Sequence, residues 1–290
     1  MSRPHVVTST ELQSLRDLEL VTKSTVEGLR QGLHRSPFHG YSAEFSQYRH
    51  YRPGDDLKYV DWKAFARTDR IYTRQFRETT NVSALFVVDI SRSMDFGSKF
   101  VLARTVAAVL GTLVLDQGDA AGMLAVDDRA HLIPSRSGRH HLRVLLAELA
   151  SLAPGGSVPV GEALRRAAAL LKRRGMVIVL SDLYEDEDAI GQIRRLARIG
   201  HDVIVIHTLS RDEMTLDVGG AAEFVDLESG SRMTVQPSAA RESYVAAFTQ
   251  WLGSVEQRLR RDGIDYVRLI AGDPLEPALR RFLVERRGMS

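Results

Sequence analysis

Three short runs of apolar residues, separated by segments with helical spacing, constrain the fold of this 290-residue chain more than any other feature. They are Ala84 to Ile90 (ALFVVDI), Met176 to Leu180 (MVIVL) and Asp202 to His207 (DVIVIH). Continuous apolar runs of this length are typical of strands that are buried on both faces, as they are in parallel sheets. We therefore expect an α/β fold, with a doubly wound, mostly parallel sheet and helices on both of its faces.

The segments around these runs supply the remaining elements. Apolar residues at helical spacing predict helices over Lys99–Leu115, Arg139–Leu149, Val160–Lys172, Asp188–Arg198, Ala239–Arg261 and Pro274–Val284. Further strands are expected at Ala120–Val126, Ala130–Ile133, Glu223–Asp226 and Asp265–Leu269. The short strand at residues 223–226 is expected to lie at an edge of the sheet.

The first 81 residues follow a different pattern. Thr10 to Gln31 has leucines and valines at helical spacing and predicts an amphipathic helix that packs on the main body. From Gly32 to Asn81 this spacing is lost, and glycines, prolines, aromatic residues and charged residues predict short strands and turns. We thus divide the chain into residues 1–81, a helix and an extension that pack on the main domain, and residues 82–290, the main domain.

Composition narrows the classes of function. The chain has no cysteine, which excludes disulfides and thiolate metal sites. Its 39 basic and 37 acidic residues nearly balance, so there is no electrostatic case for a nucleic-acid binder. The N-terminus has no apolar secretion signal, and the longest apolar stretches are too short and interrupted to span a bilayer. We expect a cytoplasmic protein without direct membrane insertion.

Polar side chains follow the predicted buried strands. In a doubly wound sheet, ligands bind beyond the carboxyl ends of the strands. Two carboxylates and three hydroxyls should meet there, from Asp89, Ser91, Ser93, Ser157 and Asp182, with the Gly155-Gly156 pair allowing the middle loop a close approach. Oxygen ligands of this kind suit Mg²⁺, or alternatively Mn²⁺ or Ca²⁺, and the absence of imidazole and thiolate in these loops disfavours zinc.

Such a site would remain electrophilic. Only two carboxylates offset the charge of a divalent cation, and Mg²⁺ usually keeps several waters. One coordination position could therefore open to an aspartate or glutamate of a partner protein.

The segment DISRS, residues 89–93, resembles the D-x-S-x-S motif of the von Willebrand factor A family, which forms the metal-ion-dependent adhesion site of that family. Ser157 falls where the family usually has threonine, and Asp182 falls at its distal aspartate. The resemblance implies a von Willebrand factor A-like main domain and a module that binds proteins and catalyses nothing.

The preceding segment, HYRPGDDLKYVDWKAFART, is similar to the signature of the bacterial domain of unknown function 58 family. The matching residues are Arg52, Pro53, Gly54, Asp55, Asp56, Asp61, Trp62, Ala66, Arg67 and Thr68. Proteins of that family are often encoded beside MoxR-type AAA+ ATPases. The resemblance implies that this chain works with such an ATPase in chaperone-like or complex-assembly tasks.

Plainer interpretations stay open beside these. The serines and Asp182 could cap helices. The acidic run Glu185–Asp188 could be a solvated helix start or a docking patch. The residues of the Arg52–Thr68 segment could be structural, with Trp62 packing the extension onto the sheet, or could form a partner interface. A purely structural scaffold without a bound ion is another possibility.

An alternative from a different class is a metal-dependent hydrolase, such as a phosphoesterase, that uses the same site. It would need a positioned general base or a second cation. The loops offer no histidine for that role, and the sequence contains neither a P-loop nor a nucleophile elbow.

Overall fold

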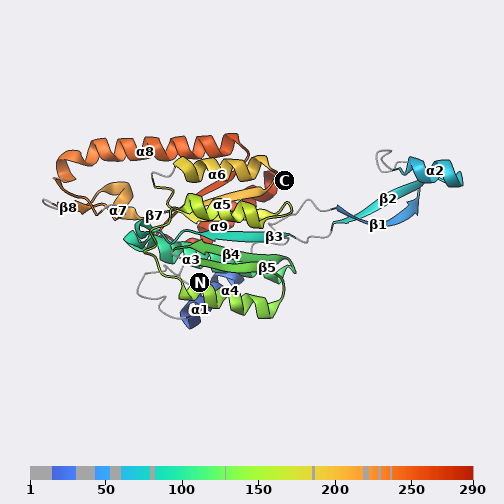
Figure 1. Cartoon of the computed structure of the whole chain (residues 1–290), viewed down its shortest axis with the longest axis horizontal. Coiled ribbons are helices and arrows are strands. Elements are labelled where there is room, and N and C mark those ends of the chain that lie inside the picture. Colours follow the sequence, from blue (N-terminus) through green and yellow to red (C-terminus); the bar gives the residue numbers. More distant parts are fainter. Residues whose placement is uncertain are drawn as a thin grey trace.

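A six-stranded sheet forms the centre of the computed structural model, which describes residues 15–30, 43–52, 60–78, 82–127, 129–184, 187–217, 222–227, 230–235 and 237–289 (Figure 1). The strands lie in the order β10-β7-β6-β3-β4-β5. Their bounds are Ser83–Val88 (β3), Ala120–Val126 (β4), Ala130–Arg136 (β5), Met176–Ser181 (β6), Asp202–Leu209 (β7) and Asp265–Ile270 (β10). All neighbours are parallel except β5, which runs antiparallel to β4. The predicted fold class is confirmed.

Helices cover both faces of this sheet. One face carries α1 (Leu15–Arg30), α3 (Lys99–Asp116), α4 (Arg139–Ser151) and α9 (Leu275–Met289), and the other carries α5 (Val160–Leu170), α6 (Glu187–Arg198) and α8 (Pro237–Arg261). Alternate residues of β3 serve the two layers: Phe86 and Val88 belong to the first core, and Leu85 and Val87 to the second. This two-sided burial explains why the strand sequences are continuously apolar.

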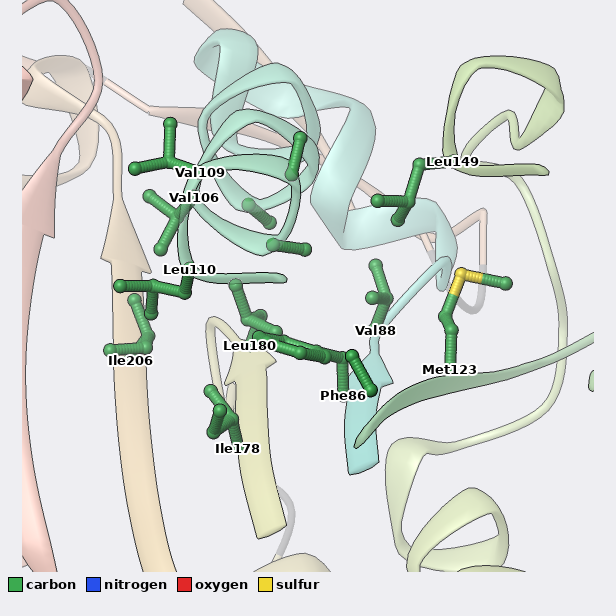
Figure 2. Close-up of a cluster of buried hydrophobic side chains, with 14 of the residues drawn as sticks. Phe86, Val88, Val106, Val109, Leu110, Met123, Leu149, Ile178, Leu180 and Ile206 are labelled. Atoms are coloured by element: carbon green, nitrogen blue, oxygen red, sulfur yellow. The ribbon is translucent and has the colours of Figure 1, made fainter. Parts of the chain in front are cut away.

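Helix α3 is enclosed by protein along its length. Together with the short 3₁₀ segment η2 (Arg92–Ser98) before it, α3 is long and apolar enough to span a bilayer by length and composition alone, but 89% of its most apolar 18-residue window is buried inside the protein. Val106 and Leu110 point onto the sheet beside Leu180 and Ile206 (Figure 2). The apolar character of α3 is accounted for by this packing.

The order of the strands creates a switch point between β3 and β6. From β3 the chain proceeds to β4 and β5 on one side, and from β6 it proceeds to β7 and β10 on the other. The connections that leave the carboxyl ends of these two adjacent strands therefore diverge. Ligands of doubly wound sheets bind in the crevice that results.

The extension before the sheet differs from our expectation. Strands β1 (Ala43–His50) and β2 (Tyr72–Glu78) pair antiparallel, with α2 (Trp62–Thr68) between them, and Figure 1 shows this arm extending away from the sheet instead of packing on it. Trp62, which one of our two interpretations of this segment packed between the extension and the sheet, is 58% exposed.

The arm can extend because it satisfies its own polar groups. Asp61 caps α2 by accepting a hydrogen bond from the Ala64 N–H at 2.9 Å, and the Tyr48 hydroxyl donates to the other carboxylate oxygen at 2.9 Å. Val60 and Thr73 form an isolated bridge and are buried beside this cap. Local burial and capping thus replace contact with the main domain.

Two smaller features of the fold were not anticipated. Strand β8 (Ala222–Val225) pairs with β9 (Arg232–Val235) in a separate two-stranded sheet, so the expectation of an edge strand in the main sheet was wrong. Helix α7 (Arg211–Thr215) is a single capped turn. The predicted ends of the first helix, Thr10 and Gln31, lie outside the described residues.

Gly122 in β4 provides a test of the sheet packing. A Cβ there would lie 2.6 Å from both the Ile133 carbonyl oxygen and the Ser135 nitrogen of β5, where backbone must move. We expect Gly122→Ala to lower the free energy of unfolding by about 2 kcal/mol, as overpacking does. Gly253→Ala, in α8, where an added Cβ would meet no other element of the described residues within 4 Å, should instead stabilise by roughly 0.5–1 kcal/mol. Equal effects in urea titrations would contradict the strand packing described.

Candidate functional site

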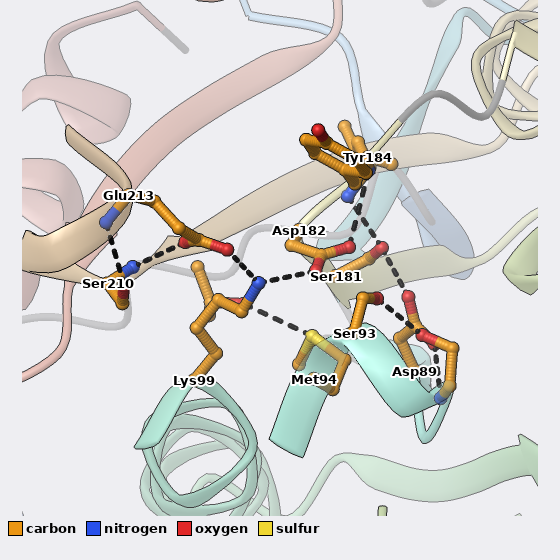
Figure 3. Close-up of polar contacts among 12 residues, drawn as sticks. Asp89, Ser93, Met94, Lys99, Ser181, Asp182, Tyr184, Ser210 and Glu213 are labelled. Atoms are coloured by element: carbon orange, nitrogen blue, oxygen red, sulfur yellow. Dashed lines mark hydrogen bonds and ion pairs between the residues drawn. The ribbon is translucent and has the colours of Figure 1, made fainter. Parts of the chain in front are cut away.

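The segments that follow β3 and β6 lie against each other at the switch point. The Asp89 N–H donates to the Leu180 carbonyl at 2.9 Å. The Asp89 carboxylate accepts from the Ser91 N–H at 2.9 Å through one oxygen and from the Ser181 hydroxyl at 2.6 Å through the other (Figure 3). Asp89 is therefore fixed from both strands.

The loop that carries Ser157 joins the same edge. The N–H groups of Gly155 and Gly156 both donate to the Ile90 carbonyl, at 3.0 and 2.8 Å, and Gly156 forms a parallel bridge with Ser91. Gly155 has a φ of +125°, which favours glycine. Ser157 follows directly and is exposed. It does not cap α5, because the N-cap of that helix is Pro159.

The two serines of the DISRS turn face each other, with their Oγ atoms 3.1 Å apart. Ser91 stands at the N-cap position of η2 but makes no side-chain capping bond. Its hydroxyl is thus directed toward Ser93, which helix capping does not explain.

Asp182 lies at the same edge and forms an ion pair with a lysine side chain. One carboxylate oxygen lies 2.7 Å from the Lys99 ammonium, and the other accepts from the Tyr184 N–H at 3.3 Å. The next residue, Leu183, is buried and has a φ of +49°, an unusual conformation for a non-glycine residue.

Lys99 also forms an ion pair with Glu213 of α7 (Figure 3). The side chains of Lys99 and Asp182 are only 2% and 4% exposed, and that of Glu213 is 17% exposed. Burial lowers the pKa of Lys99, but the two carboxylates outweigh it and raise that pKa overall. The ammonium therefore stays charged.

The Asp89 carboxyl has an unfavourable environment for its negative charge. Burial and then the charge of Asp182 raise its pKa to about 6, although the hydrogen bonds from Ser181 and Ser91 oppose the shift. A nearby cation would stabilise the ionised form of this carboxyl group. Within the described residues no three His, Cys, Asp or Glu side chains cluster as a metal site, so any cation held here depends on the serine hydroxyls as well.

A family model described as "Protein of unknown function DUF58" matches residues 47–251. The chain belongs to this family. The uncharacterized protein Rv1480 of Mycobacterium tuberculosis (strain ATCC 25618 / H37Rv) is 30% identical over 288 residues, which cover 94% of this chain and 89% of Rv1480. The uncharacterized protein YeaD of Bacillus subtilis (strain 168) is 25% identical over 154 residues, which cover 52% of this chain and 38% of YeaD.

Solved structures resemble this DUF58 chain more distantly. BatB from Bacteroides thetaiotaomicron is 19% identical with a TM-score of 0.42, and the match covers 71% of this chain and 99% of BatB. The VWA domain of SpRpn10 is 12% identical with a TM-score of 0.37, and the match covers 72% of this chain and 95% of that domain. At these scores the likenesses add nothing to what the sheet itself shows.

The acidic run is only partly described in this family member. Glu187 pairs with Arg258 through two hydrogen bonds of 2.8 and 2.6 Å, and Asp188 pairs with Arg165. Both acids lie in the first turn of α6, which fits a solvated helix start. Glu185 and Asp186 lie outside the described residues, as do Asp55 and Asp56 of the signature segment.

Several residues of the site were missed by the sequence analysis. Ser181 directly precedes the predicted Asp182, and its hydroxyl donates a hydrogen bond to Asp89. Lys99 and Glu213 come from a helix start and from α7, and one signal was available for the latter: Ser210 and Glu213 have the spacing of a capping box, which the structure contains.

His207 of β7 forms a hydrogen bond with the backbone of Asp182. Its Nε2 lies 2.7 Å from the Asp182 carbonyl oxygen, and its Nδ1 lies 2.7 Å from the Tyr266 hydroxyl. A carbonyl only accepts, so Nε2 carries the proton and Nδ1 accepts from the tyrosine. Burial lowers the pKa of His207 to about 4.

This lowered pKa predicts a loss of stability in acid. The unfolded chain binds a proton at His207 near pH 6.5 and the folded protein only near pH 4, so the contribution is complete above pH 6.5 and falls as the pH drops toward 4. Between pH 7 and pH 5 the loss should be on the order of 2 kcal/mol. His207→Gln should lack this part of the loss in urea titrations, whereas His140→Gln, at an exposed position, should keep it. Identical pH dependence in all three proteins would contradict the buried neutral imidazole.

Proposed function

We propose that this DUF58 protein is a protein-interaction module in which a divalent cation binds at Asp89, Ser91 and Ser93, with Ser157 and Asp182 completing the site. The cation would be Mg²⁺, or alternatively Mn²⁺ or Ca²⁺, since the donors are carboxylate and hydroxyl oxygens. An acidic residue of a partner protein would take the coordination position that remains open.

The observation that carries this proposal is the meeting of two buried carboxylates and a pair of serine hydroxyls at the switch point of the sheet. Asp89 is held by Ser181, while the charge of Asp182 helps to raise its pKa. A divalent cation would offset this repulsion. The Ser91 and Ser93 hydroxyls, 3.1 Å apart, are spaced to serve one small ion together.

The partner that the family resemblance suggests is a MoxR-type AAA+ ATPase, with a role in chaperone-like or complex-assembly tasks. We propose it as the first protein to test. The site chemistry specifies only that the partner contributes an aspartate or glutamate at its contact surface.

We also propose that the site catalyses no reaction. His207 contacts the Asp182 backbone, and both of its ring nitrogens are occupied, one by the Asp182 carbonyl and the other by the Tyr266 hydroxyl. A hydrolase would need a free base close to the cation. Assay of a generic phosphoester with Mg²⁺ should therefore show no turnover above that of the Asp89→Ala variant, and turnover that depends on Asp89 would establish the alternative.

Asp89→Ala tests the binding function. It removes the carboxylate shared by the two strands, so we expect Mg²⁺ and Mn²⁺ affinity to fall about tenfold or more in calorimetric titration, because a ligand and a negative charge are lost. Capture of the candidate ATPase should also be lost, as it should be for the unaltered protein in EDTA.

Asp95→Ala is the matched control, since Asp95 is an exposed acid of the neighbouring η2 segment. It should bind cation and partner normally, and thermal melts should establish that both variants are folded. Unchanged cation binding by a folded Asp89→Ala variant would refute the proposed site.

A further inference from the structure

Lys99 occupies a position that ordinary helix chemistry disfavours. It is the first residue of α3, where the aligned peptide dipoles present a partial positive charge, and its side chain is 2% exposed. A buried ammonium at a helix N-terminus requires strong compensation. Here the compensation comes from Asp182, a residue of the proposed cation site, and from Glu213.

Glu213 is itself held in place. Its second carboxylate oxygen accepts from the Ser210 N–H at 2.9 Å, and its own N–H donates to the Ser210 hydroxyl at 3.2 Å. Ser210 packs against the turn that leads into α3, because a Cβ on Gly97 would lie 2.2 Å from the Ser210 Cβ. These contacts hold the Glu213 carboxylate next to Lys99.

We propose that Lys99 and Glu213 set the affinity of the site for its cation, Lys99 by serving as an internal cation that weakens binding and Glu213 by partly cancelling that effect. The inference rests on the proposed function and deepens it. Neither residue is assigned as a ligand. Lys99 acts through Asp182, whose carboxylate it shares with any ion bound at the site, and Glu213 acts through Lys99.

The charges of the cluster explain why such an adjustment matters. With all groups ionised, Asp89, Asp182, Glu213 and Lys99 carry three negative charges and one positive charge. The net charge equals and opposes that of one divalent cation. A carboxylate of a partner would then approach a neutral cluster, whereas without Lys99 it would approach one that remains negative after the cation has bound.

A set of three variants changes this charge in a graded way. Lys99→Met removes the ammonium and makes the cluster more negative by one unit. Glu213→Gln makes it less negative by one unit and keeps an oxygen that can accept from the Ser210 N–H. The double variant Lys99→Met/Glu213→Gln lacks both groups and restores the net charge of the unaltered protein, so it separates charge from side-chain geometry.

Calorimetric titration with Mn²⁺ and with Mg²⁺ is the measurement. We expect Lys99→Met to bind about tenfold more tightly than the unaltered protein, Glu213→Gln about tenfold more weakly, and the double variant to lie near the unaltered protein, since one unit charge a few ångströms from a divalent ion has about this effect even with strong solvent screening. Lys99→Arg, which keeps the charge, should bind as the unaltered protein does. Thermal melts should accompany each titration.

The outcomes separate this inference from the proposed function. If Asp89→Ala loses cation binding while Glu213→Gln and a folded Lys99→Met bind as the unaltered protein does, the site stands and the role of Lys99 is refuted. If Lys99→Met does not fold, Glu213→Gln decides alone: weaker binding supports the inference and unchanged binding overturns it. If the unaltered protein binds no cation, a gain of binding in Lys99→Met supports the inference, and its absence in every variant overturns both.

Discussion

The parallel pairing of β3 with β6 is the constraint on which the candidate site depends. It brings together residues that are about ninety positions apart in the chain, and it does so where the connections leaving two neighbouring parallel strands turn in opposite directions. Val88 pairs with Leu180, so Asp89 and Ser181 follow at the same height and can share a hydrogen bond. The other contacts of the site add further segments around this pair of residues.

The glycine-rich loop before α5 adds the third segment through backbone bonds. Two consecutive N–H groups share the Ile90 carbonyl, which holds Ser157 at the rim while its side chain remains exposed to solvent. Asp89 and Ser181 thus form the hydrogen-bonded base of the site, and Ser157 lies at its exposed rim. Hydrogen bonds keep the side chains of the base in fixed positions, and the exposed rim is accessible to another molecule.

Much of the fold could be predicted from the sequence, because strands that are buried on both faces of a parallel sheet appear in it as continuous apolar runs. The runs 84–90, 176–180 and 202–207 gave strands β3, β6 and β7 to within about two residues, and their order implied which polar residues would share one edge. The contact of Lys99 with Glu213 could not be foreseen, since it spans 114 positions and depends on where the short helix α7 comes to lie. The position of the arm was not foreseen because Trp62 is the type of residue that usually packs against a domain. In the structure Val60, Asp61 and Thr73 are buried within the arm itself.

The arm and the sheet edge that carries Asp89 lie at opposite ends of the molecule. The arm lies before β3 in the chain and beyond the amino end of that strand, while Asp89 follows its carboxyl end (Figure 1). A six-residue strand at roughly 3.3 Å per residue separates the two by about 20 Å, before the length of the arm is added. A molecule that contacts the exposed Trp62 would therefore leave the exposed Ser157, beyond the other end of the sheet, uncovered.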